Sequence, residues 1–136
     1  MPYKEIDHTA DWCIEVKGSD LPSLFSESAR GMNALAGMVL KPAPEVEKTW
    51  SAVLPDYESL LVAFLSELIY WLEQDHVGFN DYCLSFNDLK GQVSLSAFLK
   101  GAPIASLEKQ VKAVTFHDLR ISRKGRWYQT RITFDV

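Results

Sequence analysis

The stretch from 57 to 75, YESLLVAFLSELIYWLEQD, most constrains what this chain can fold into. Its large apolar residues recur every three or four positions, which predicts one amphipathic helix with a wide apolar stripe. Asp56 stands where an N-terminal cap is needed. The helix is therefore expected to contribute mostly to a core, through Leu60, Leu61, Phe64, Leu65, Leu68, Ile69 and Leu72.

The polar side of this helix is entirely acidic. Its charged residues are all carboxylates, and two aromatic residues, Tyr70 and Trp71, lie near its end. This composition makes the helix a candidate docking face for a partner. A merely solvated polar side is the plainer interpretation. The carboxylates are Glu58, Glu67, Glu73 and Asp75.

The remaining patterns predict one further helix and about eight strands. Asp20 can cap a helix that carries Pro22 in its first turn, and Gly37 suits the end of that helix. Alternation and turn residues then predict the strands. The result is an α+β domain with a mainly antiparallel sheet and two helices. The expected strands are 3–6, 12–17, 49–54, 79–86, 93–99, 111–116, 119–122 and 127–134.

Size and composition favour one soluble cytoplasmic domain spanning residues 1–136. A chain of 136 residues with 47% apolar content is of common single-domain size. No apolar run approaches the roughly 20 residues of a membrane helix, and the N-terminus lacks the order of a secretory signal. Cys13 and Cys83 form no metal-ligand spacing, which predicts a reducing compartment and two buried thiols.

Charge is distributed unevenly along the chain. The net charge of −4 argues against a non-specific nucleic-acid binder. Residues 1–99 carry a net charge of −9, however, and residues 100–136 carry +5. Either portion could face a charged partner, or the two could fold against each other and neutralise in part.

A first candidate site is the pentapeptide DHTAD, between the two first strands. Asp7, Thr9 and Asp11 share one parity, so an extended segment would point them to one side. Carboxylates so spaced suit a hard cation such as Mg²⁺ or Ca²⁺. Two carboxylates are too few for a site, and capping of a turn is the commoner role of such residues.

The other end of the chain could supply the missing oxygens. Asp135 is followed by Val136 and its carboxylate, and a last strand paired beside the first strands would bring both close to Asp11. The alternative is a frayed tail with a solvated Asp. Ile132 and Phe134 favour the paired strand, because they form an apolar side that is expected to be buried.

Lys112 is a second candidate. It lies in an otherwise apolar predicted strand, where an ammonium can meet a phosphate or hold carboxylates, although an exposed edge position is more common. His8, His76 and His117 share no metal-ligand or catalytic spacing, so each is expected to be structural. Phosphate-loop, nucleophile-elbow, Cys–His and zinc motifs are absent from the sequence, which argues against an independent enzyme.

Five stretches in order resemble the archease family over essentially the whole chain. They are DHTAD, LPSLFSESA, YESLLVAFLSELIYWLE, VKAVTFHDLRI and RWYQTRITFDV. The resemblance implies an α+β fold of strand–helix–strand–strand units. It also implies a cytoplasmic, non-enzymatic accessory protein in tRNA splicing and RNA repair. Such a protein activates the RNA ligase that joins 2′,3′-cyclic-phosphate ends to 5′-hydroxyl ends.

The resemblance further implies partners and site residues. The ligase would be the direct partner, with RNA and GTP met through it, and activation would promote ligase guanylylation and multiple turnover. Asp11, Asp135 and the main-chain oxygen of Val136 would hold a divalent metal ion, either Ca²⁺ or Mg²⁺/Mn²⁺. Lys112 would be essential for activation, whereas Asp7 and His8 belong to the motif without a defined role. A chaperone-like modulator of a tRNA methyltransferase is a second expectation.

Three classes of function therefore stay open at the level of sequence. An accessory protein predicts no catalysis alone, and a metal-dependent hydrolase predicts turnover without a partner. A plain RNA-binding module predicts salt-sensitive affinity for RNA. Trp127 and Tyr128 keep this third class open. Its basic residues would be Lys109, Arg120, Arg123, Lys124, Arg126 and Arg131.

Overall fold

The structure, a computed structural model, describes residues 2–6 and 12–136. These residues form two helices and nine strands. The strands that precede the second helix are β1 (Tyr3–Ile6), β2 (Trp12–Gly18), β3 (Val39–Leu40) and β4 (Val46–Leu54). Those that follow it are β5 (Val77–Leu89), β6 (Gln92–Ser106), β7 (Ala113–Thr115), β8 (Ser122–Lys124) and β9 (Trp127–Asp135). The helices are α1 (Leu21–Ala36) and α2 (Tyr57–Asp75).

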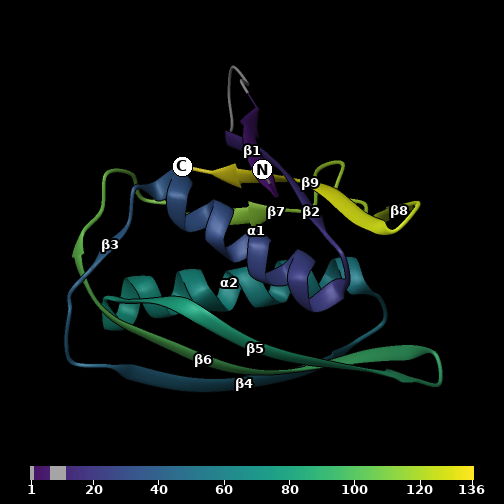
Figure 1. Ribbon diagram of the computed structural model, residues 1–136, viewed down its shortest axis with the longest axis horizontal. Helices are drawn as coiled ribbons and strands as arrows, with labels where there is room; N and C mark the ends of the chain where they lie inside the picture. Colours follow the sequence, from purple (N-terminus) through teal and green to yellow (C-terminus); the bar gives the residue numbers. More distant parts are fainter. Residues whose placement is uncertain (1, 7–11) are drawn as a thin grey trace.

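The elements form three layers, with both helices between two antiparallel sheets (Figure 1). One sheet has five strands in the order β1-β2-β9-β7, with β8 also paired to β9. The other has four strands, in which β6 pairs with β3, β4 and β5. The α+β class with two helices is confirmed. The single sheet expected from the sequence is instead two sheets, and both contact the helices.

Local sequence explains where each helix begins and ends. The carboxylate of Asp20 accepts a hydrogen bond from the Ser23 amide at 2.8 Å, and that of Asp56 accepts one from the Ser59 amide at 2.7 Å. Both are the predicted N-caps. Gly37 ends α1 with φ 62°. His76 ends α2 with φ 54°, a left-handed conformation uncommon for a residue with a side chain.

The core lies between the sheets and contains the predicted apolar stripe of α2. Phe64 of α2 and Phe25 of α1 pack with ring centroids 5.9 Å apart. Ile132 and Phe134 of β9 are fully buried where the five-stranded sheet faces the helices. The last strand is therefore anchored in the core, as its alternation predicted, and it pairs with β2 along the whole length of β2.

Several strand bounds differ from the predicted ones. Strands β5 and β6 continue well past 79–86 and 93–99, because they pair with each other almost from end to end. The strand predicted at 119–122 is wrong: the amide of Ile121 donates to the Glu58 carboxylate at 3.0 Å, and pairing with β9 begins only at Ser122. The short strand β3 had no sequence signal.

The two thiols differ in burial. Cys13 is buried, as predicted, and its Sγ lies 3.2 Å from the Thr133 hydroxyl oxygen. Cys83 is exposed, so that part of the prediction is wrong. It lies on the outer face of β5, which the helices do not cover. Within the described ranges, neither helix is long and apolar enough to cross a membrane.

Candidate functional site

The predicted site residues that the structure describes meet at one end of the five-stranded sheet. Trp12, the first residue of β2, is paired with Phe134, and Ala113, the first residue of β7, is paired with Asp135. The Lys112 amide donates to the Asp135 carbonyl oxygen at 2.8 Å. Strand β9 thus runs between β2 and β7, and it brings the lysine segment beside the last residues of the chain.

Buried and exposed side chains alternate around this point. The buried ones anchor the main chain, and the charged ones are exposed to solvent. Val111 and Phe134 are buried in the core, whereas Lys112 and Asp135 are exposed. Val136 is half-buried against the core. Within residues 2–6 and 12–136, neither Lys112 nor Asp135 forms an ion pair. Both side chains are exposed, as contact with a ligand or a partner requires.

The predicted residues Asp7, His8 and Asp11 lie outside the described residues. In the described part of the chain, no three His, Cys, Asp or Glu side chains are grouped closely enough to hold a metal ion. Asp135 and the main-chain oxygen of Val136 are hard oxygen donors of the kind that Ca²⁺ and Mg²⁺ prefer. The donor chemistry therefore fits such a cation, although these two residues alone are too few to hold it.

A second lysine near this end of the sheet, Lys109, was expected only as one of the basic residues of an RNA-binding module. Lys109 Nζ lies 3.3 Å from the centroid of the Trp12 ring, which is a close cation–π contact. The amides of Glu108 and Lys109 both donate to the Ala36 carbonyl oxygen, at 2.9 and 3.0 Å, and so fix the segment to the end of α1. No sequence pattern signalled this contact, because its partners are far apart in the chain.

The two described histidines differ in their surroundings. His76 is the C-cap of α2. The His117 ring lies 3.4 Å from the Asp118 carboxylate, with both side chains largely exposed, and the His117 amide donates to the Thr115 hydroxyl. Asp118 itself has φ 52° in this turn. Neither histidine belongs to a cluster suited to catalysis among the residues that the structure describes.

The acidic helix is less exposed than its sequence suggested. Trp71 is buried, with its ring centroid 5.6 Å from that of Phe79. Two of the helix carboxylates have partners in the fold, since Glu58 accepts the Ile121 amide and Asp75 lies 3.3 Å from Lys48 Nζ. The expectation that Trp71 adds to a docking face is therefore wrong, while Tyr70 is exposed.

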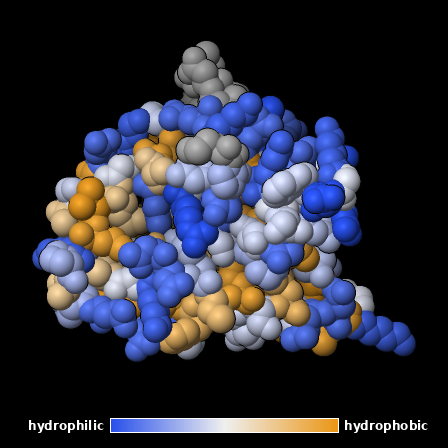
Figure 2. Space-filling model, viewed as in Figure 1, coloured by the Kyte–Doolittle hydropathy of each residue, from blue (hydrophilic) through white to orange (hydrophobic). Residues whose placement is uncertain are grey.

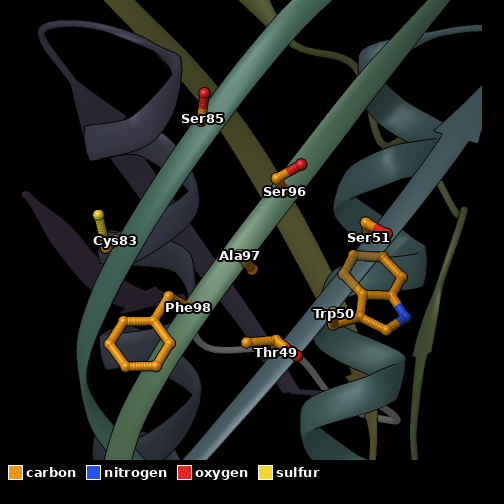
Figure 3. Close-up of a pocket in the computed structure, with 8 residues that line it drawn as sticks. All are labelled: Thr49, Trp50, Ser51, Cys83, Ser85, Ser96, Ala97 and Phe98. Atoms are coloured by element: carbon orange, nitrogen blue, oxygen red, sulfur yellow. The ribbon is translucent and has the colours of Figure 1, made fainter.

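An open cavity of about 690 Å³ lies elsewhere, against the four-stranded sheet. Figure 3 shows that its lining residues come from three adjacent strands, with Thr49 on β4, Cys83 and Ser85 on β5, and Ser96 and Phe98 on β6. Apart from the Cys83 thiol, these side chains carry no group that titrates. The cavity thus offers little for acid–base or metal chemistry.

Comparison with known proteins places the whole chain in one family. Residues 3–136 match the Archease protein family (MTH1598/TM1083). The chain belongs to the archease family. It is 29% identical to protein archease of Methanosarcina barkeri over 139 residues, covering 98% of this chain and 95% of the relative. It is 30% identical to protein archease of Pyrococcus furiosus, with 92% of each chain covered.

Solved archease-like structures share the fold. The solution structure of Methanobacterium thermoautotrophicum protein 1598 superposes with a TM-score of 0.81 at 24% identity, over 99% of both chains. A crystal structure from Thermotoga maritima, described as an archease and possible chaperone, superposes with a TM-score of 0.70 at 24% identity. That match covers 98% of this chain and 96% of the other. The archease resemblance stated from the motifs is thus confirmed, and at this identity these structures support the fold alone.

Proposed function

We propose that this archease-family protein is an accessory protein that activates the tRNA-splicing RNA ligase. The ligase would join 2′,3′-cyclic-phosphate ends to 5′-hydroxyl ends, and this protein would promote guanylylation of the ligase by GTP and so permit multiple turnover. One observation carries the proposal. Lys112 and Asp135 are on hydrogen-bonded segments at one end of the sheet, where β2 begins at the residue after Asp11.

In this proposal the residues divide into a metal-binding set and a cationic group. Asp11, Asp135 and the main-chain oxygen of Val136 would hold a divalent cation. When bound, the cation would neutralise negative charge where phosphates gather. Lys112 would extend its ammonium to the ligase's nucleotide site, since phosphoryl transfer depends mostly on positioning and on charge stabilisation. Its exposed side chain and its anchored main chain suit that role.

Multiple-turnover ligation tests the proposal. The ligase from the same organism, with GTP and a divalent metal ion, would be assayed on RNA with a cyclic-phosphate end and a 5′-hydroxyl end, with and without this protein. We expect a large rise in turnover that is lost in the Asp11→Ala, Lys112→Ala and Asp135→Asn variants. Lys90→Ala is the matched control, because Lys90 is an exposed lysine in the turn between β5 and β6.

The opposite outcome is equally informative. If a ligase competent for a single turnover gains nothing from this protein, the accessory role is wrong. The description of the Thermotoga maritima relative as a possible chaperone would then direct attention to the second role, a chaperone-like modulator of a tRNA methyltransferase. Solubility and activity of that methyltransferase, measured with and without this protein, would be the next experiment.

A further inference from the structure

The five-stranded sheet has an outer face that the helices do not cover. Along β9, Tyr128 and Ile132 pack toward the core, so the alternate residues Trp127, Gln129 and Arg131 point to the opposite side. Of these, Trp127 is 46% exposed, so part of its indole is open to a ligand. Figure 2 shows that hydrophilic residues gather over this sheet in the upper part of the view.

Strand register places basic side chains around Trp127 on this outer face. Lys124 of β8 is directly opposite Trp127, and Lys17 of β2 is directly opposite Gln129. Arg131 follows Gln129 on the same side of β9, about 7 Å further along the strand. Lys17, Lys124, Trp127 and Arg131 are hereafter called the basic face. Each of the four is exposed.

A polar hollow adjoins the basic face. It has a volume of about 180 Å³, and Arg120 and Arg131 line it together with Ser122 and Gln129. Its two carboxylates, Glu15 and Asp118, contact other side chains, since Glu15 lies 3.4 Å from Lys4 Nζ and Asp118 lies 3.4 Å from the His117 ring. Two arginines therefore line this hollow together with hydroxyl and amide residues, a composition suited to an anionic oxygen.

Glu15 of β2 is directly opposite Arg131, but no ion pair among the described residues joins the two. The ion pairs found among the described residues join Lys4 to Glu15, Arg30 to Glu27, Lys48 to Asp75 and His117 to Asp118. None of these pairs joins a basic residue of 100–136 to an acidic residue of 1–99. The charge segregation seen in the sequence is thus kept in the fold, as a surface with a cationic excess.

We infer that the basic face binds single-stranded nucleic acid, with phosphates on its lysines and arginines and one base stacked on Trp127. Exposed cations on neighbouring strands can follow an extended phosphodiester backbone, and an exposed indole offers a π-face that any unpaired base can use. A duplex would leave the indole unused, because its bases are already stacked. The inference goes beyond the proposed function, since it concerns this protein alone.

Fluorescence anisotropy with a labelled single-stranded oligoribonucleotide of about 12 nucleotides tests the inference without any ligase. We expect saturable binding that weakens as salt rises, and weaker competition by a duplex of the same length. Lys17→Gln, Lys124→Gln and Arg131→Gln should each weaken binding and lower the salt slope by about one. Trp127→Ala should weaken binding about tenfold, with circular dichroism used to confirm folding.

Matched controls come from other parts of the surface. Tyr70→Ala removes an exposed aromatic ring from α2, and Lys90→Gln removes a charge from the turn between β5 and β6. Both should bind RNA like the parent protein. Lack of saturable binding, or equal weakening in test and control variants, overturns the inference. Polyglutamate that competes as well as RNA does, with no effect of Trp127→Ala, would instead assign the face to an acidic protein.

Discussion

The Lys112 amide lies 2.8 Å from the Asp135 carbonyl oxygen, so the main chain alone holds these two residues together. Because the lysine ammonium is not needed for this bond, Lys112→Ala should leave stability almost unchanged, within about 0.5 kcal/mol. Val111→Ala is the matched comparison. Val111 is buried in the core, and its truncation should cost roughly 2 kcal/mol. Urea unfolding followed by circular dichroism distinguishes the two. Equal losses in both variants would give the lysine side chain a structural role.

The contact of Lys109 with the Trp12 ring predicts a measurable coupling. With the ammonium 3.3 Å from the ring centroid, Lys109→Gln should lower the free energy of unfolding by about 0.5–1 kcal/mol. A double-mutant cycle with Trp12→Leu should recover most of that loss as an interaction energy.

Lys100→Gln provides the control for distance, since Lys100 Nζ lies 5.7 Å from the Phe98 ring centroid. Lys100→Gln should lower the free energy of unfolding by less than Lys109→Gln does. A coupling near zero in the Trp12 cycle would mean that solvent screens the ammonium from the ring.

Local signals explain why much of the fold could be predicted from sequence. The caps Asp20 and Asp56 act on amides three residues away, so short patterns suffice to find them. The burial of Ile132 and Phe134 likewise follows from alternation along a single strand. Division into two sheets could not be predicted in this way, because alternation gives the faces of a strand but not its partners.

Long-range contacts explain the parts that sequence missed. The Ile121 amide donates to the carboxylate of Glu58, which belongs to another element. The strand therefore begins later than its apolar residues indicated. Cys83 is exposed because none of the described elements covers the outer face of its sheet. At the candidate site, Lys112 and Asp135 were named from the sequence and from the archease resemblance, and their roles stay a prediction. The contact of Lys109 with Trp12 was not, since it depends on the tertiary fold.

Two tyrosines predict a loss of stability at high pH. The Tyr57 hydroxyl donates to the Asp88 carboxylate at 2.6 Å, and this bond raises the pKa of Tyr57 to about 12. Burial raises the pKa of Tyr82 to about 12 as well. Both pKa values are above the unfolded value of about 10. The stabilisation is therefore complete below about pH 10 and is lost as the pH rises through 12.

Spectrophotometric titration of tyrosinate, together with urea unfolding over the same pH range, measures this effect. Tyr57→Phe and Tyr82→Phe should each remove one group from the phase near pH 12. Asp88→Asn should move Tyr57 toward its ordinary pKa, because the carboxylate charge is gone while a hydrogen-bond acceptor is kept. An unchanged high-pH phase in Asp88→Asn would show that the carboxylate does not control Tyr57.

Thr130 offers a stabilising substitution. Its hydroxyl oxygen is buried and has no hydrogen-bond partner among the residues that the structure describes. An unpaired buried hydroxyl costs free energy, so the nearly isosteric Thr130→Val should raise the free energy of unfolding by about 1 kcal/mol. For a chain of this length that corresponds to a rise in Tm of roughly 4 °C.

Thr133→Val is the matched control on the same strand. Its hydroxyl contacts the Cys13 thiol at 3.2 Å, so this change should be neutral or cost up to about 1 kcal/mol. Opposite signs for the two variants support an unsatisfied hydroxyl at 130, whereas destabilisation of both would mean that an ordered water pairs with Thr130.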